Sequence, residues 1–215
     1  MKAYLTKGVV ANRAAPTHTA ADMNKVIQYA DEIIATGATL TPGYFDNFSK
    51  NNNVLSTENL FTGENFGGTS SGNVRSRYFC SLHYNQTPSG WNGFTTLSDF
   101  YAKFDAADTR RGQAYPGVTN VSGLRVGLLL GQQFDQNGVA LQDRKGNPLS
   151  FTAAVKAIET NPNTLEVTGI RVVKYPPDLT NGDNVDNDYV FLRLGDVLLM
   201  KAEAIQRGGT ATLGQ

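Results

Sequence analysis

Three charged residues interrupt an apolar run near the end of the chain, and their types would suit acid–base chemistry. Arg193 and Asp196 lie three residues apart, and Glu203 follows seven residues after Asp196. On a helix this spacing places all three side chains near one face, where two carboxylates can serve as general acid and general base. The apolar context favours a structural role instead, because ion pairs that join a buried helix to its neighbours are costly to break. We therefore expect these residues to stabilise the fold, and we assign no catalytic residues.

The single tryptophan, Trp91, lies in a passage rich in Gly, Asn and Pro. An indole ring can stack on the apolar face of a sugar while polar neighbours orient the ligand. The predicted ligand contacts are Trp91, Tyr84, Asn85 and Asn92. Tyr44 and Tyr115, which also fall on loops, are weaker candidates. The alternative is that Trp91 anchors its glycine-rich loop onto the scaffold.

An acidic loop covers residues 183–188 and could hold calcium, because Asp and Asn oxygens are ligands that Ca²⁺ prefers. An EF-hand needs Gly at position six and Glu at position twelve, where this chain has Asp188 and Leu194. We therefore expect a solvated turn with Asp188 as the N-cap of the next helix. No metal or other cofactor is expected, with calcium as the weaker alternative. His18 and His83 have no metal-ligand spacing to each other and are expected at the surface or in packing.

The hydrophobic pattern predicts the helices that would position these residues. Thr19 is a predicted N-cap with Asp22 in the capping-box position, and the apolar stripe that follows should end at Gly37. A second strong helix is predicted over 188–205 and a further one over 97–107. The first residues, 1–5, are typical of the last turns of a helix that ends at a glycine, Gly8.

Extended structure is expected in three places. Residues 59–61 are predicted to form a short extended piece, and residues 123–131 and 165–175 are predicted to form a small sheet or hairpin. Between these elements the chain is rich in polar loop residues, with 22 Gly and 10% aromatic residues. That composition suits aromatic-bearing loops on an ordered scaffold.

The charge balance argues against a nucleic-acid binder, because Lys and Arg total 19 and Asp and Glu also total 19. No stretch reaches the roughly 20 apolar residues of a membrane span, and the first residues lack the features of a signal peptide. Any export signal is therefore expected outside this sequence. The single cysteine, Cys80, excludes an intrachain disulfide.

The final predicted helix carries the run FLRLGDVLLMKAEA, residues 191–204, which resembles the SusD/RagB signature of an Arg, an Asp, an aliphatic run and Ala-Glu-Ala. Residues 81–101, which include GWNGF and DFY, resemble the Gly-Trp-containing middle region of that family, and FDAADTRR, residues 104–111, resembles its Phe, Asp and Arg pattern. The early helix, Tyr44 and TENLF, residues 57–61, resemble its helical-repeat region. One departure is Gly195, where the family more often has Ala, at a cost of up to about 1 kcal/mol in helix propensity.

The resemblance implies a mainly α fold of the SusD type, with tetratricopeptide-type helical repeats, long loops and a small β element. The chain would be an internal fragment of one such domain, truncated at both ends. Residues 1–62 would form a helical-repeat part, 63–185 a loop-rich middle region and 186–215 a second helical-repeat part.

The same resemblance implies a nutrient-binding lipoprotein of the bacterial outer membrane, at the cell surface and lipid-anchored outside this sequence. It would capture an oligosaccharide in a polysaccharide uptake system, beside a TonB-dependent transporter, and would not be an enzyme or bind nucleic acid. A peptide cargo is the first alternative. A glycoside hydrolase and an interaction scaffold without a small ligand are the others.

Overall fold

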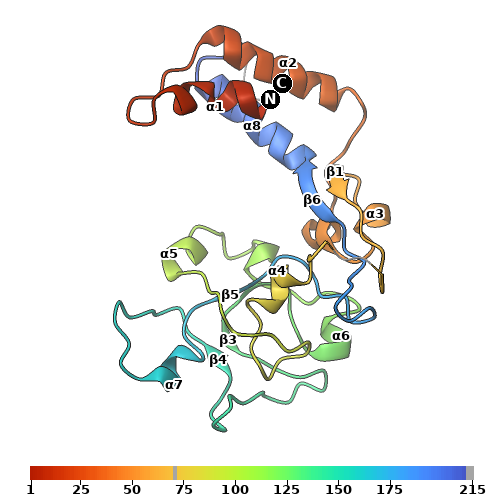
Figure 1. Ribbon diagram of the computed structural model, residues 1–215, viewed down its shortest axis with the longest axis vertical. Helices are drawn as coiled ribbons and strands as arrows, with labels where there is room; N and C mark the ends of the chain where they lie inside the picture. Colours follow the sequence, from red (N-terminus) through yellow and green to blue (C-terminus); the bar gives the residue numbers. More distant parts are fainter. Residues whose placement is uncertain (70–71, 212–215) are drawn as a thin grey trace. The chain divides into compact units, whose positions relative to one another are not determined.

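A computed structural model of the chain describes residues 1–69 and 72–211, and these residues form two compact units (Figure 1). The helical unit comprises residues 1–42, 54–62 and the described residues from 190 onward. The loop-rich unit comprises residues 43–53 and 63–189. The expected tail of the second helical part, residues 212–215, lies outside the described residues, and the expected three-part division of one domain stays a prediction.

The helical unit is built from α1 (Lys2–Ala11), α2 (Ala20–Ile34) and α8 (Leu194–Gln206), with α2 packed along α8. Its core consists of buried apolar side chains from all three helices: Leu5, Met23, Val26, Ile27, Ala30, Leu194, Val197, Met200 and Ala204. The predicted start of α2 is confirmed, because the Thr19 hydroxyl accepts the Asp22 N–H at 3.1 Å. The predicted end is also confirmed, since Gly37 has a φ of +85°.

The expectation that Gly8 ends a helix was wrong, because α1 continues through it to Ala11. A Cβ on Gly8 would lie 1.7 Å from the carbonyl oxygen of Thr17. Gly8 is therefore required by the close approach of the following loop to the helix, which the sequence pattern does not reveal.

Strand β6 (Tyr189–Arg193) pairs with β1 (Asn59–Gly63) and leads directly into α8. The extended piece predicted at 59–61 is thus confirmed, but the predicted helix start at Asp188 was wrong. Arg193 is the N-cap residue, and its N–H donates to the carboxylate of Asp196 at 3.3 Å. Residues 189–192 are aromatic, β-branched or aliphatic, and such residues fit a pleated, half-buried strand.

The described residues of the loop-rich unit form two small antiparallel sheets. Strand β2 (Gly127–Leu129) pairs with β5 (Arg171–Val173), with Leu128 opposite Val172, which confirms the sheet predicted from the sequence. Strand β3 (Gly131–Gln132) pairs with β4 (Ser150–Phe151). The remaining helices of the chain are about one turn each: η1 (Tyr44–Phe48), α3 (Asn52–Leu55), α4 (Ser76–Phe79), α5 (Ser98–Tyr101), η2 (Thr109–Arg111), α6 (Thr119–Ser122) and α7 (Pro162–Leu165).

The expected mainly α class with tetratricopeptide-type repeats was wrong. Within the described residues only α1, α2 and α8 exceed five residues, and they form one helical cluster instead of a series of stacked pairs. The rest is held by short strands, turns and side-chain contacts. Gly, Asn and Pro recur too densely through this part for longer helices to form.

The helix predicted over 97–107 is another correction, because only α5 (Ser98–Tyr101) forms. Past it, the carboxylate of Asp105 accepts the Ala107 N–H at 2.9 Å, which is a turn that competes with the helix. The Phe104 carbonyl accepts a hydrogen bond from Arg111 at 3.4 Å. Local side-chain hydrogen bonds therefore override the apolar periodicity.

Candidate functional site

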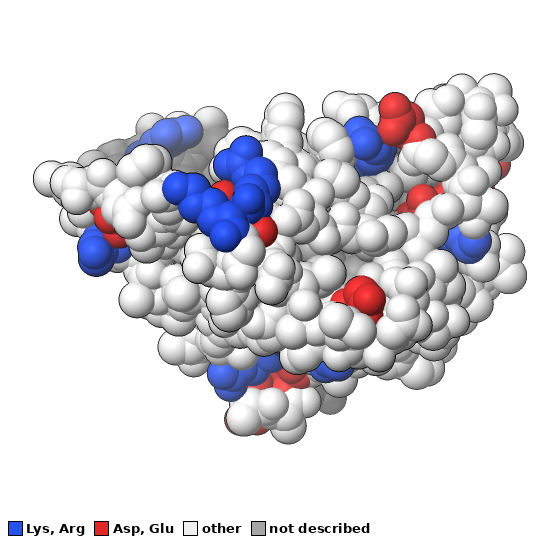
Figure 2. Space-filling view, turned by 90° about the horizontal axis from the view of Figure 1, so that it is seen from below, with Lys and Arg blue, Asp and Glu red and all other residues white. Residues whose placement is uncertain are grey.

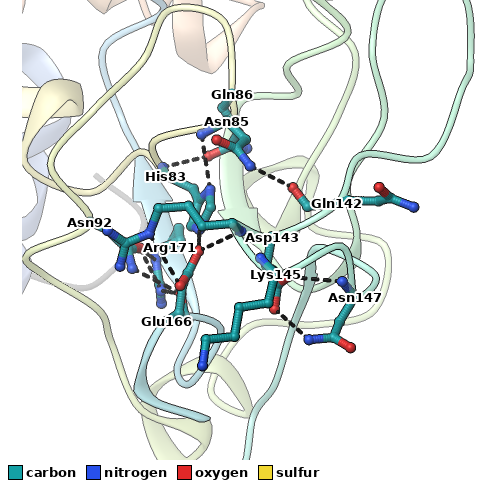
Figure 3. A network of polar contacts seen from close by, with 11 residues as sticks. His83, Asn85, Gln86, Asn92, Gln142, Asp143, Lys145, Asn147, Glu166 and Arg171 are labelled. Atoms are coloured by element: carbon teal, nitrogen blue, oxygen red, sulfur yellow. Dashed lines mark hydrogen bonds and ion pairs between the residues drawn. The ribbon is translucent and has the colours of Figure 1, made fainter. Parts of the chain in front are cut away.

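A buried network of polar side chains around His83, Glu166 and Arg171 binds two of the predicted ligand contacts, Asn85 and Asn92 (Figure 3). One carboxylate oxygen of Glu166 lies 2.9 Å from Nε2 of His83 and accepts the backbone N–H of Arg144 at 3.0 Å. The other lies 3.3 Å from Nε of Arg144. His83 and Glu166 are both buried, and both oxygens of the carboxylate are engaged.

The guanidinium of Arg171 is fully buried and bound mainly by backbone carbonyls. It donates to the carbonyls of Thr168 at 2.6 Å, Gly169 at 2.9 Å and Glu166 at 2.9 Å. The Asn92 amide oxygen accepts from its Nε at 3.0 Å and its Nη2 at 2.7 Å. Burial lowers the pKa of Arg171 to about 10, so it remains charged at neutral pH.

His83 is neutral at physiological pH. Burial lowers the pKa of its imidazole, and the hydrogen bond to Glu166 opposes that shift without cancelling it. The backbone N–H of Asn85 donates to Nδ1 at 3.0 Å, so Nδ1 carries no proton and Nε2–H donates to Glu166. His83 and Glu166 are bound to each other and to the backbone N–H groups of Asn85 and Arg144, so the network joins loops that are distant in the sequence.

Two of the predicted contacts, Tyr84 and Asn85, lie directly above this network. The Tyr84 ring packs edge-on to His83 at 5.2 Å, lies under the Arg144 guanidinium at 4.2 Å and remains 38% exposed. The Asn85 side chain is exposed and donates to the carbonyl of Gln142 at 2.9 Å. Both residues therefore lie at the surface, on a loop that is held by its contacts with His83.

Trp91 is 52% exposed, and its ring lies 5.9 Å from that of Phe79 at a tilt of 39°. Its backbone N–H donates to the Phe79 carbonyl at 3.1 Å. A Cβ on Gly93 would lie 2.9 Å from the indole nitrogen, so a glycine is needed where the ring passes over the chain. We call the Trp91 and Phe79 rings the Trp91 platform.

The side chain of Asn92, the fourth predicted contact, forms hydrogen bonds with buried groups. Besides accepting from Arg171, it donates from Nδ2 to the Glu166 carbonyl at 2.8 Å. Its φ of +57° is a left-handed conformation that Asn tolerates better than most residues. Asn92 thereby joins the loop of Trp91 to the buried network.

The charged residues of α8 lie in the helical unit. Nη1 of Arg193 lies 2.9 Å from a carboxylate oxygen of Glu58, and its Nε lies 3.6 Å from the Asp196 carboxylate. Glu203 pairs with Arg207 instead. The same Glu58 oxygen also accepts the Gly195 N–H at 3.3 Å, so Glu58 caps the helix.

Carboxylates of the acidic loop, residues 183–188, accept hydrogen bonds from backbone N–H groups of the protein. Asp188 accepts the N–H of Asn65 at 2.9 Å, Asp186 accepts that of Gly67 at 2.8 Å, and Asp178 accepts that of Asp186 at 3.0 Å. Within residues 1–69 and 72–211, no group of three or more His, Cys, Asp or Glu is placed to hold a metal ion. Calcium at this loop stays a hypothesis.

Sequence reasoning missed Glu166, Arg171 and Glu58. Arg171 had a detectable signal, because it is the one charged residue in the otherwise apolar run from Ile170 to Val173. A charge in a buried strand requires hydrogen-bonding partners. Glu58 and Glu166 carry no comparable local pattern.

No protein-family model and no curated protein sequence matches the chain. Among solved structures, surface glycan-binding protein A from Bacteroides thetaiotaomicron is similar to it, with a TM-score of 0.48 and 17% sequence identity. The likeness covers 90% of this chain and 41% of that protein's chain, so the chain spans less than half of its length. At this identity and TM-score the likeness assigns neither a family nor a ligand.

The surface shown in Figure 2 is largely uncharged, with small groups of Lys and Arg interspersed with Asp and Glu. Such a face does not offer the continuous basic surface of a nucleic-acid binder. Among the helices described, none has the length and apolar content needed to cross a membrane.

Proposed function

We propose that this chain captures a carbohydrate on the loop-rich unit and does no chemistry on it. The observation that carries the proposal is the Trp91 platform, a half-exposed indole on a loop fixed by buried hydrogen bonds. An exposed aromatic face can stack on the apolar face of a sugar ring. Because the loop is already ordered, binding costs little additional conformational entropy.

We assign the predicted contacts different roles in this proposal. Trp91 and Tyr84 contact the ligand through their exposed rings, and Asn85, which follows Tyr84 in the chain, offers an exposed amide. Asn92 is a positioning residue, because its side chain is bound to Arg171 and to the Glu166 carbonyl.

Hydrolysis of a sugar by the carboxylate of Glu166 is disfavoured because that carboxylate is buried and already hydrogen-bonded. Glycoside hydrolysis requires two carboxyl groups that reach the scissile bond. Glu166 is buried, and its oxygens are taken by His83 and Arg144. The geometry therefore favours binding over hydrolysis.

The proposal extends to the setting that the SusD/RagB resemblance implies. There the protein is held at the cell surface of the outer membrane by a lipid anchor and passes its ligand to a TonB-dependent transporter. Support for this setting comes from the sequence resemblance alone.

The test is native affinity electrophoresis of the full-length protein through gels that contain single soluble polysaccharides. We expect retardation by at least one polysaccharide, with no release of reducing ends. Trp91→Ala should weaken that binding at least about tenfold, which is about 1.4 kcal/mol, because an aromatic anchor is lost. Phe66→Ala is the matched control, since Phe66 is 57% exposed in the same unit but lies outside the platform.

Unchanged retardation in Trp91→Ala would remove the platform from the site. Absence of retardation by any polysaccharide, from protein with an intact melting transition, would overturn carbohydrate capture. Binding of a peptide library by that same sample would then favour the peptide alternative.

A further inference from the structure

Two arginine side chains of the loop-rich unit line one small hollow, and among the described residues neither has an acidic partner. Arg111 and Arg125 border a hollow of about 100 Å³, whose other lining residues include Tyr101, Gln132 and Gln133 and no Asp or Glu. Within the part of the chain that the structure describes, neither guanidinium forms an ion pair, although several other arginines do. The hollow therefore carries a positive charge that its own residues do not neutralise.

Most hydrogen-bond donors of these two arginines remain available to a ligand. Arg111 lies 4.2 Å over the Tyr101 ring and donates one hydrogen bond, to the Phe104 carbonyl at 3.4 Å. Arg125 donates one, to the Gly112 carbonyl at 2.9 Å. Since a guanidinium has five N–H donors in a planar fork, both can bind a carboxylate or sulfate through paired hydrogen bonds.

The backbone holds the two arginines in fixed positions relative to each other. Gln113 and Val126 exchange two hydrogen bonds of 3.0 Å, which joins the segment that follows Arg111 to the segment that contains Arg125. A Cβ on Gly127 would lie 2.5 Å from the Arg110 carbonyl oxygen, so η2 packs directly on β2. This is a prepared site, and binding would require little rearrangement.

An aromatic hollow lies next to the arginine hollow, and the two share Leu128. It measures about 190 Å³ and is lined by apolar and aromatic side chains that include Tyr44, Phe100 and Phe104. Phe100 and Phe104 pack edge to face at 5.2 Å. Arg110 and Lys174 also border this hollow. Asp108 binds the Arg110 guanidinium at 2.5 and 2.9 Å and offsets its charge, and the Lys174 ammonium lies 4.4 Å from the centre of the Phe48 ring.

We propose that these two hollows bind an acidic sugar, with its ring in the aromatic hollow and its anionic group between Arg111 and Arg125. The anionic group is the carboxylate of a uronic acid or a sulfate ester, which present the same chemistry to a guanidinium fork. The two hollows contain none of the residues of the Trp91 platform, so they form a second subsite on the loop-rich unit. This inference adds the ligand class to the proposed carbohydrate capture and rests on that proposal. The aromatic rings can stack on neutral and acidic sugars alike, and the two arginines favour the acidic ones.

The experiment measures affinity of the full-length protein for paired polymers by native affinity electrophoresis. Polygalacturonate is compared with its carboxyl-reduced, neutral form, and dextran sulfate is compared with dextran. We expect at least tenfold tighter binding of one acidic polymer than of its neutral counterpart, and the pair that shows it identifies the group as carboxylate or sulfate. The double variant Arg111→Gln, Arg125→Gln should reduce the affinity for that acidic polymer to the level of its neutral counterpart.

The matched control is Arg13→Gln, Arg77→Gln, which removes the same charge from two exposed arginines outside the hollow. Equal binding of acidic and neutral polymers, or the same loss in the control, would overturn the inference and leave carbohydrate capture intact. Failure to bind any polymer, neutral ones included, would overturn carbohydrate capture itself. If the double variant does not fold, Arg125→Gln alone should still weaken acidic binding about fivefold, and no change in it would count against the site.

Discussion

At the scale of single residues, the loop that carries Trp91 is bound through Asn92 to buried polar groups that satisfy one another. Within residues 1–69 and 72–211 Arg171 forms no ion pair, yet three carbonyls and the Asn92 amide receive its donors. A buried cation without an anion is tolerated only when such hydrogen bonds replace its hydration. The position of the loop that carries Trp91 therefore depends on Arg171 and on each group that accepts its hydrogen bonds.

The buried His83 predicts a pH dependence of stability. Burial lowers its pKa in the folded protein, whereas in the unfolded chain the pKa is about 6.5. The unfolded state therefore binds a proton more readily, and the stability that His83 contributes is fully present above about pH 6.5 and lost as pH falls below it. The slope approaches at most about 1.4 kcal/mol per pH unit.

Melting temperatures of the full-length protein between pH 7.5 and 5 measure this effect. We expect His83→Gln to flatten the decline, because glutamine can still donate to Glu166 but does not titrate. A decline of the same steepness in His83→Gln would show that other groups cause it.

At the scale of elements, the start of α8 explains why a glycine occupies a helical position. A Cβ on Gly195 would lie 2.8 Å from the Glu58 carboxylate oxygen that binds Arg193. That carboxylate is buried and caps the helix, where negative charge is favourable. Gly195 departs from the alanine that the SusD/RagB resemblance implies at this position. The contact with Glu58 explains why a glycine is found there.

Gly195→Ala should therefore destabilise the protein although alanine is the better helix former. The helix gains up to about 1 kcal/mol in propensity, but displacement of Glu58 weakens charged hydrogen bonds worth about 1.5–3 kcal/mol each. We expect a net loss of about 1 kcal/mol in the free energy of unfolding, measured with urea. Leu199→Ala, at an exposed position of the same helix, should change it by less than about 0.5 kcal/mol. Increased stability of Gly195→Ala would contradict the role given to Glu58.

At the scale of the whole molecule, the two units use different means to remain ordered. The helical unit buries an apolar core between three helices. The loop-rich unit has short strands, and many of its backbone N–H groups are bound by side chains. In its network, for example, the Gln86 amide oxygen accepts the His83 N–H at 2.9 Å and His83 accepts that of Asn85 at 3.0 Å.

Hydrogen exchange of the full-length protein should therefore reveal slow amides outside regular secondary structure. We expect His83 and Asn85 to exchange slowly, as α2 and α8 do, because their N–H groups are hydrogen-bonded and, at His83, buried. The exposed stretch 154–158 should exchange fastest. Mass spectrometry of peptic fragments gives the comparison, and rapid exchange across residues 83–86 would show that the polar network does not hold the loop.

The sequence alone determined the features that depend only on residues close together in the chain. The apolar stripe after Thr19 and the left-handed turn at Gly37 are properties of neighbouring residues, and the extended runs that became β2 and β5 lie within a few residues of glycines. Equal numbers of acidic and basic residues likewise follow from composition.

Only the tertiary structure decided which distant polar groups meet. Glu58 and Arg193 are separated by 135 positions, and His83 and Glu166 by 83. No periodicity encodes such pairs, because they form only after loops close and bury them. The same reason explains the failure of the helical-repeat prediction, since a family signature in α8 says little about loops that are held by long-range contacts. The hollow between Arg111 and Arg125 is also a product of that folding, and no spacing in the sequence marks it.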